Sequence, residues 1–394
     1  MSRALAARTF RANPHYDLVL LDRLGPAEQA ALVELESRDD TYGLLRPRPE
    51  SGLELRPASM EVALLFLTLE RPQPLPAYVR AQLGDDLDRS IGRLVLDGVL
   101  EIEDEGAYVC GAKAGELVLS SRSEGGRGRI GEESVAALRY AQELADLPAP
   151  LLAMRLYLYG RRPVSPELQR RLPDEAAVAS YLGIGPGGTA RAALDSGWRA
   201  VPSPGERRYW RTWRRRTVGG VTDGQGLTPY KLYVSPAIDA LAGALGTVAE
   251  SLAHAPGVSA FKVGADLVGI CRPDKLVVYF DRLDDLQRAA AQLEQRLNGC
   301  PAHGVPFTAP VSADGLLSWG ADPPAPSPVE GESLTSWRMW VTERLAEYLV
   351  VARESGAGTI EPWQFALERL RLSGIDTDTW APASDMWPVA LASA

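Results

Sequence analysis

Residues 230–235 read Tyr-Lys-Leu-Tyr-Val-Ser, and this alternation of side chains predicts a β-strand. Neighbouring side chains of a strand point to opposite faces, so Lys231, Tyr233 and Ser235 would share one face. Pro236 ends the strand, because proline has no N–H to donate to a sheet. Residues 237–253 then carry apolar side chains at helical spacing, which predicts a helix after the strand.

Two more strands follow this helix. Residues 260–263, Ala-Phe-Lys-Val, come after a Pro-Gly turn, and residues 275–280, Lys-Leu-Val-Val-Tyr-Phe, come after Arg272-Pro-Asp. Residues 283–297 predict a helix with acidic residues early and arginine late, as the helix dipole favours. The order β-α-β-β-α indicates an α+β module. Its sheet would bring together three lysines: Lys231, Lys262 and Lys275.

Lysine is rare in this chain, since the 42 Lys and Arg residues include only four lysines. A single lysine is ordinarily a solvated charge. An amine, however, shifts its pKa readily on burial, whereas a guanidinium does not deprotonate in proteins. Like charges and desolvation would both lower the pKa of the most buried lysine of a cluster. The three neighbouring lysines therefore indicate a general base near neutral pH.

An arginine-rich run with aromatic residues lies just upstream of the first strand. The guanidinium fork binds phosphate bidentately and stacks on rings, so this composition indicates a phosphate or nucleic-acid contact. A solvated amphipathic segment has the same composition. A neutral lysine beside a phosphate clamp suits β-elimination of phosphate from phosphoserine or phosphothreonine. The arginines are Arg207, Arg208, Arg211, Arg214, Arg215 and Arg216, interleaved with Tyr209, Trp210 and Trp213.

These residues carry a family resemblance. Residues 230–235 resemble the Trp-Lys-Leu-His-Val-Ser motif in the phospho-Ser/Thr lyase domains of class III and IV lanthipeptide synthetases, and Phe261-Lys262 is similar to their next Phe-Lys. Residues 274–279 resemble their Gly-Lys strand ending in Val-Tyr. Residues 304–308 and 315–323 resemble the HopA-type effector family, whose members serve as lyases in class V lanthipeptide and thioamitide pathways. The resemblance spans about residues 205–325 and implies a lyase that makes dehydroalanine or dehydrobutyrine.

The candidate site residues follow from the pattern and the resemblance together. Lys231 or Lys262 would be the base. Tyr233 stands where the synthetase domains place a histidine proposed as general acid, and a phenol can donate a proton in its place. His303, close to the family's closing motif, is the other candidate acid, although a loop histidine is more often a surface residue. The phosphate would be held by Lys275, Arg272, Arg211, Arg214 and Arg216.

Composition narrows the class of protein. The net charge of −9 excludes a general nucleic-acid binder, so the arginine run is a local feature. The three cysteines show neither a CxxC motif nor Cys/His spacing, which predicts no disulfide framework and no zinc site. No apolar stretch is long enough for a membrane helix, and the N-terminus is too polar for a signal peptide. We expect a cytoplasmic protein with neither a metal nor an organic cofactor.

A separate N-terminal domain is predicted over residues 1–120. A strand at 16–22, helices at 26–37, 60–69 and 77–96, and a hairpin turning at 104–106 give the outline of a winged helix. Such domains bind leader peptides by adding a strand to the wing, and they also bind DNA. The many Asp and Glu residues between 80 and 105 would repel phosphates, which favours a peptide over DNA. A purely structural wing is an alternative.

The rest of the chain is predicted to be helical around the core. A helical segment at 130–200 would precede the lyase-like core at 205–325, and C-terminal helices would occupy 330–394. No kinase signature is present, so a separate kinase-like protein would have to phosphorylate the precursor peptide. The main alternative to a lyase is a non-catalytic scaffold of the same fold that binds the peptide or the kinase. A winged-helix DNA-binding regulator would need a basic recognition helix, which the sequence lacks.

Overall fold

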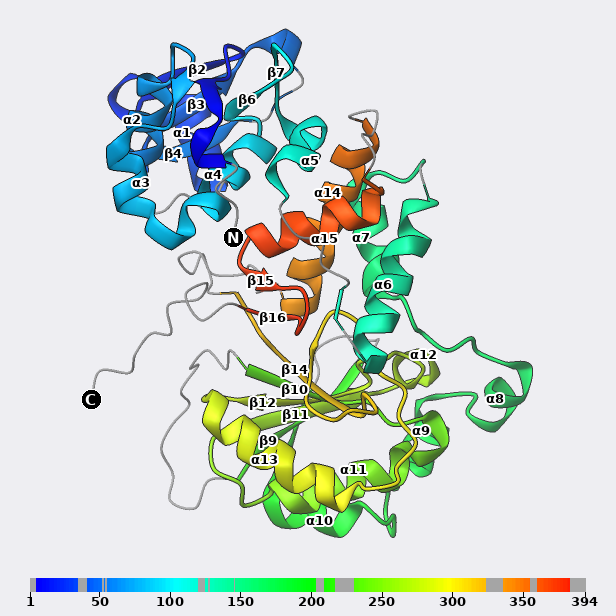
Figure 1. The fold of residues 1–394 in the computed structure, drawn as a ribbon. Helices are drawn as coiled ribbons and strands as arrows, with labels where there is room; N and C mark the ends of the chain where they lie inside the picture. Colours follow the sequence, from blue (N-terminus) through cyan, green and yellow to red (C-terminus); the bar gives the residue numbers. More distant parts are fainter. Residues whose placement is uncertain are drawn as a thin grey trace. The chain divides into compact units, whose positions relative to one another are not determined.

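The fold is α+β, with helices and several antiparallel sheets in a computed structural model (Figure 1). The chain divides into two compact units, Met1–Ser123 with Glu347–Ser373, and Glu124–Ala346 with Gly374–Ala394. The four predicted segments stay a prediction, because compactness alone does not show which parts fold independently. The structure describes residues 5–34, 41–51, 53, 55–119, 125–126, 128–144, 146–202, 209–216, 230–323, 336–354 and 360–382.

The first unit contains two small sheets. Their strand orders are β5-β1-β6-β7 and β2-β3-β4. The strands are β1 (Thr9–Ala12), β2 (Tyr16–Leu20), β3 (Thr41–Pro47), β4 (Arg56–Ser59), β5 (Gln73–Pro74), β6 (Leu100–Asp104) and β7 (Ala107–Val109). The helices are α1 (Pro26–Glu34), α2 (Met60–Thr68), α3 (Ala77–Leu83), α4 (Leu87–Leu96), α5 (Gly115–Val118) and α15 (Pro362–Leu372).

The predicted hairpin of this unit is present, and one predicted helix is broken. β6 and β7 pair from Ile102 to Asp104, and Glu105 and Gly106 form the turn with positive φ, as a two-residue hairpin loop requires. The helix predicted over 77–96 is wrong as a single element. It divides at Gly84, which adopts φ +48 and ends α3. The last residues of the helix predicted at 26–37 lie outside the described residues.

The second unit is built on one seven-stranded antiparallel sheet, in the order β13-β14-β10-β12-β11-β9-β8. Two further short strands, β15 (Ile375–Asp376) and β16 (Ala381–Pro382), pair with each other. The sheet strands are β8 (Trp198–Val201), β9 (Trp210–Arg215), β10 (Tyr230–Val234), β11 (Val258–Gly264), β12 (Leu276–Phe280), β13 (Ala309–Pro310) and β14 (Leu317–Ala321). The helices are α6 (Gly128–Gln142), α7 (Ala149–Tyr157), α8 (Pro166–Arg171), α9 (Glu175–Tyr181), α10 (Arg191–Gly197), α11 (Leu241–Leu252), α12 (Leu267–Ile270), α13 (Leu283–Arg296) and α14 (Trp337–Glu354), which crosses the boundary between the units.

One face of this sheet is apolar and packs against α10, α11 and α13 (Figure 1). Leu232, Phe261 and Val278 are fully buried there. The Phe261 ring stacks on Trp213 at 5.1 Å and meets Trp198 edge-on at 4.6 Å. Burial of a side chain of this size stabilises a fold by roughly 1.5–3 kcal/mol. The period of two then directs the alternate residues of β10, β11 and β12 to the opposite face.

The strand register brings the polar residues of that second face together. Lys231 lies opposite Tyr279, while Tyr233 and Lys262 both lie opposite Val277, one on each side of β12. The sheet therefore presents two of the four lysines and a phenol on one face.

Among the residues that the structure describes, no helix is sufficiently long and apolar to span a membrane.

Candidate active site

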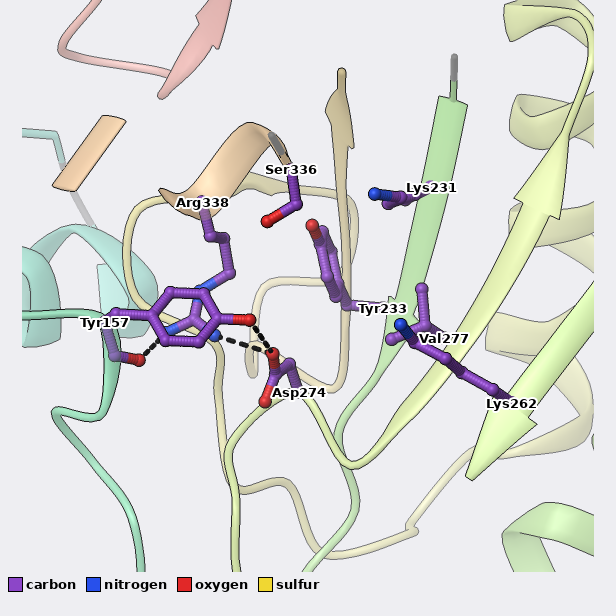
Figure 2. A pocket seen from close by; sticks show the side chains of 8 residues that line it. All are labelled: Tyr157, Lys231, Tyr233, Lys262, Asp274, Val277, Ser336 and Arg338. Carbon is purple, nitrogen blue, oxygen red and sulfur yellow. Dashed lines mark hydrogen bonds and ion pairs between the residues drawn. The ribbon is translucent and has the colours of Figure 1, made fainter. Parts of the chain in front are cut away.

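A pocket opens on the polar face of the seven-stranded sheet (Figure 2). β10, β11 and β12 provide its base, the end of α7 provides one wall, and the first turn of α14 provides another. Figure 2 shows Tyr233 in the middle, with the two lysines on one side and the arginine–aspartate pair on the other. The lining residues are Tyr157, Lys231, Tyr233, Lys262, Asp274, Val277, Ser336 and Arg338.

Lys262 has the environment of a general base. Its Nζ lies 4.3 Å from the centre of the Trp210 ring and 5.6 Å from that of Tyr279. Burial, followed by the positive charge of Lys231, lowers the pKa of Lys262 to about 8. With this pKa about a tenth of the amine is uncharged at pH 7, compared with well below a thousandth for a solvated lysine. Lys262 can therefore accept a proton near neutral pH.

Lys231 lies at the other end of the same face. It forms an ion pair with Asp322, and its Nζ lies 5.6 Å from the centre of the Tyr279 ring. The other carboxylate oxygen of Asp322 accepts a hydrogen bond from the backbone N–H of Trp337 at 2.8 Å. Asp322 thus connects the Lys231 ammonium to the first turn of α14.

Tyr233 projects between these groups and is only 3% exposed. Burial, with Asp322 as the next contribution, raises the pKa of the Tyr233 phenol well above its ordinary value. The phenol is therefore protonated throughout the physiological range. In Figure 2 its hydroxyl points towards Ser336, between Lys231 and Arg338. A protonated hydroxyl in this position can donate a hydrogen bond or a proton to a bound anion.

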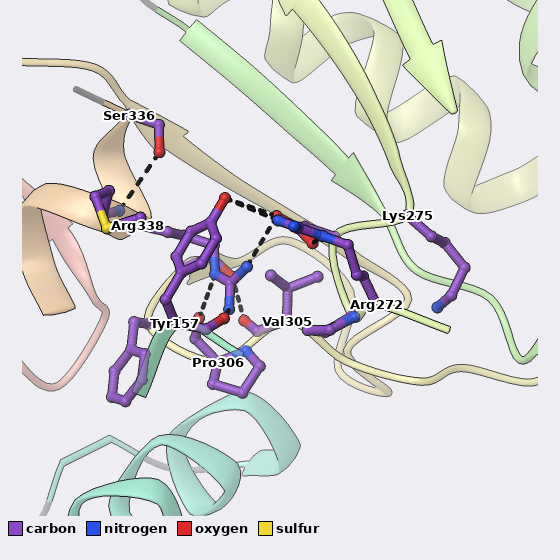
Figure 3. A network of polar contacts seen from close by, with 12 residues as sticks. Tyr157, Arg272, Lys275, Val305, Pro306, Ser336 and Arg338 are labelled. Carbon is purple, nitrogen blue, oxygen red and sulfur yellow. Dashed lines mark hydrogen bonds and ion pairs between the residues drawn. The ribbon is translucent and has the colours of Figure 1, made fainter. Parts of the chain in front are cut away.

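Arg338 and Asp274 form the other side of the pocket (Figure 2), and Figure 3 shows the polar contacts around Arg338. Arg338 is 1% exposed, and its Nη2 and Nε donate to the backbone oxygens of Tyr157 at 2.8 Å and Pro306 at 3.2 Å. Its Nη1 lies 3.0 Å from Oδ2 of Asp274. Arg272 donates to both carboxylate oxygens of Asp274 at 2.8 Å and to the hydroxyl of Tyr157 at 2.8 Å.

Two guanidinium groups thus share one buried carboxylate. Burial alone would raise the pKa of Asp274, but Arg338 and Arg272 hold it below its ordinary value. Burial would lower the pKa of Arg272, but the hydrogen bond and the charge of Asp274 raise the pKa of Arg272 above its ordinary value. Nη1 of Arg338 is buried, and its partner among the described residues is Oδ2 of Asp274 in the ion pair. The guanidinium on this side of the pocket is therefore held in place before any ligand binds.

Lys275 and His303 lie outside the pocket lining. Nζ of the fully buried Lys275 donates to Pro236 O at 2.9 Å and lies 2.7 Å from Nδ1 of His303, whose Nε2 lies 2.7 Å from Gly160 O. Burial lowers the pKa of Lys275 to about 7. Burial, followed by Lys275, lowers that of His303 to about 3. A neutral imidazole accepting from Lys275 and donating to Gly160 fits this geometry. Their predicted roles as phosphate ligand and general acid stay predictions.

The arginines of the predicted phosphate clamp are dispersed. Arg211 donates to Glu175 O at 3.0 Å, and Arg216 donates to Trp198 O at 2.7 Å. Arg214 is exposed on the same sheet face as Lys262, and none of these three side chains lines the pocket. Arg272 contacts the pocket through Asp274. Arg207 and Arg208 lie outside the described residues.

Sequence reasoning missed much of the pocket wall. Tyr157 lies in the predicted helical segment 130–200 and Arg338 in the predicted C-terminal helices, and no site residue was predicted in either. Asp274 and Asp322 lie within the motifs that carry the resemblance, and Asp274 stands next to Lys275 and two residues from Arg272. A carboxylate close in sequence to candidate cations was therefore the available signal for Asp274. Within the described residues no three His, Cys, Asp or Glu side chains are arranged to hold a metal ion.

Comparisons with known proteins give distant structural likenesses. No family model matches the chain, and no curated protein matches it. An effector protein from Pseudomonas syringae pv. tomato strain DC3000 superposes with a TM-score of 0.39 at 13% identity, covering 64% of this chain and 97% of its own. An effector from Pseudomonas syringae pv. syringae strain 61 gives 0.35 at 15% identity, covering 65% and 99%. A phosphothreonine lyase structure gives 0.25 at 16% identity, covering 34% and 71%. The chemistry of this chain therefore has to be read from its own residues.

Proposed function

We propose that this chain is a lyase that eliminates phosphate from a phosphothreonine or phosphoserine of a peptide. The observation that carries the proposal is Lys262, a largely buried amine whose pKa is lowered to about 8, facing a pocket of fixed cations. A base of this strength suits the removal of a proton next to a carbonyl group at neutral pH. The cations suit a leaving group that departs as a phosphate anion.

In the proposed reaction Lys262 takes the α-proton of the phosphorylated residue. The electron pair of the broken C–H bond forms the Cα–Cβ double bond, and the Cβ–O bond breaks with its electrons remaining on the phosphate. The products are dehydrobutyrine or dehydroalanine, inorganic phosphate and a protonated Lys262. Loss of that proton to solvent returns the amine, and a general acid that has protonated the phosphate regains its proton from solvent, so the cycle consumes neither an oxidant nor a co-substrate.

The other pocket residues act on the departing phosphate. Lys231 and Arg338 provide positive charge from two sides of the pocket. Tyr233 remains a neutral phenol at neutral pH and is our candidate for the general acid. Because Asp274 and Asp322 hold these cations in place before substrate binds, little reorganisation is needed when charge develops.

The motif resemblance extends the proposal to the substrate. We infer that the peptide is a ribosomally made precursor of lanthipeptide or thioamitide type, phosphorylated by a separate kinase-like protein. The missing kinase signature in this chain supports a separate kinase. We further infer that the predicted winged-helix-like region binds the leader peptide.

The test uses the purified full chain and a phosphothreonine peptide without added metal. We expect mass spectrometry to detect loss of phosphoric acid and formation of a dehydro residue that adds a thiol. Lys262→Met should abolish this product, whereas Lys113→Met, which removes the lysine of the first unit, should not. Regeneration of threonine would indicate a phosphatase. Binding of the phosphopeptide without any turnover would indicate the non-catalytic scaffold instead.

A further inference from the structure

Two arginines at the edge of the seven-stranded sheet lie directly opposite each other. Arg199 of β8 pairs in register with Arg214 of β9, and both side chains are exposed. Like charges at directly opposed positions of neighbouring strands destabilise the pairing. Within the part of the chain that the structure describes, no carboxylate forms an ion pair with either guanidinium.

The neighbouring arginines are engaged within the protein. Arg211 contacts Glu175, Arg215 donates to Ala255 O at 2.6 Å, and Arg216 donates to Trp198 O at 2.7 Å. These contacts occupy hydrogen-bond donors of the three arginines within the protein itself. Arg199 and Arg214 differ from them because no contact within the described residues occupies their donors.

The register places this arginine pair beside the pocket. Arg214 lies opposite Ala260, and Lys262 is two residues further along β11, so the three side chains share one sheet face. With a strand spacing of about 4.8 Å and a rise of about 3.4 Å per residue, the Cα atoms of Arg214 and Lys262 are about 8 Å apart. On the same basis Arg199 and Lys262 are about 12 Å apart. An extended peptide spans these distances in about two to four residues.

We propose that Arg199 and Arg214 form a subsite for an acidic side chain of the substrate, two to four residues from the phosphorylated residue. This subsite rests on the proposed function, because it takes Lys262 as the position of the phosphorylated residue. Its chemistry is a guanidinium pair binding a carboxylate. A preference for acidic residues near the site of elimination follows from this arrangement.

Binding is measured in a variant that lacks the proposed base, so that turnover of the peptide does not affect the result. In the Lys262→Met background, fluorescence anisotropy compares a labelled phosphothreonine peptide carrying Asp at these positions with the same peptide carrying Asn. We expect the Asp peptide to bind about five- to tenfold more tightly at low salt, because exposed ion pairs each contribute up to about a factor of five. Added salt should reduce the difference. A peptide with phosphoserine in place of Asp decides whether the subsite prefers a carboxylate or a second phosphate.

The arginine variants assign the preference to the subsite. In Arg199→Gln/Arg214→Gln the Asp and Asn peptides should bind equally, whereas the control Arg191→Gln/Arg288→Gln, with the same change in net charge, should keep the preference. Arg199→Glu/Arg214→Glu should instead prefer a Lys-containing peptide. Equal binding of the Asp, phosphoserine and Asn peptides to the parent overturns the subsite. Elimination by wild-type chain from the Asn peptide tests the proposed function separately, so each idea can fail alone.

Discussion

Lys231→Met and Asp322→Asn should move the pH dependence of elimination in opposite directions. With a pKa of about 8 for Lys262, the uncharged fraction rises from about 3% at pH 6.5 to about 90% at pH 9, so kcat should increase about thirtyfold over this range. Lys231 lowers the pKa of Lys262, and Asp322 raises it. Removing Lys231 should therefore move the rising limb to higher pH, and removing the Asp322 charge should move it to lower pH.

The size of the Lys231 effect follows from the geometry. Both ammonium groups lie 5.6 Å from the centre of the Tyr279 ring, so they are at most about 11 Å apart. At an effective dielectric constant of about 20, this separation corresponds to at least about 1.5 kcal/mol, which is about one pKa unit. The rising limb of the Lys231→Met profile should therefore move by about one pH unit. Its kcat should also fall, because Lys231 no longer places a positive charge beside the leaving phosphate.

The assay measures kcat at saturating phosphopeptide between pH 6.5 and 9.5, by mass spectrometry of the dehydro product. The lower limit avoids the second ionisation of the substrate phosphate, near pH 6. Lys113→Met serves as the control and should keep the parental profile. If the parent shows no rising limb, or if neither variant moves it, Lys262 is not the base.

Two further predictions concern the acid and the stability of the site. Tyr233→Phe should lower kcat by about 10²- to 10⁴-fold if the phenol protonates the phosphate. His303→Ala should keep turnover per folded molecule within about threefold of the parent. The reverse order in steady-state assays would assign the acid to His303. Lys262→Met should raise the free energy of unfolding at pH 7 by about 1–3 kcal/mol, because the folded state holds the ammonium at a pKa below its unfolded value. This gain is full below pH 8 and disappears as the pH approaches 10.5, and urea unfolding that shows no gain at pH 7 would contradict it.

The polar sheet face was predictable from the sequence, and the pocket walls were not. The alternation in residues 230–235 places Lys231 and Tyr233 together without any knowledge of the fold, and the same period in β11 adds Lys262. Lys275 has the correct parity for this face. It lies beyond the end of β12, however, where Pro236 and His303 enclose it, and strand periodicity carries no information on such loops.

Arg338 shows the other limit of sequence reasoning. Helical periodicity gives the face on which a side chain lies, and it does not give the element that this face contacts. The pairing of Arg338 with Asp274 joins residues 64 positions apart and depends on how the first turn of α14 packs beside Asp274. The break at Gly84 was missed for a local reason, because the apolar period of residues 77–96 continues across it.

The contacts of Arg338 also limit how far the chain can be shortened. This one guanidinium fastens α14 to the end of α7 at Tyr157, to the loop at Pro306 and to Asp274. Residues 205–325 contain all the recognisable motifs, yet a fragment with these bounds would lack both Tyr157 and Arg338. Asp274 would then keep only one of its two cationic partners. The smallest portion able to cradle a phosphate is therefore larger than its signature sequences suggest, and transplanting the strands alone would transfer the base without its anion cradle.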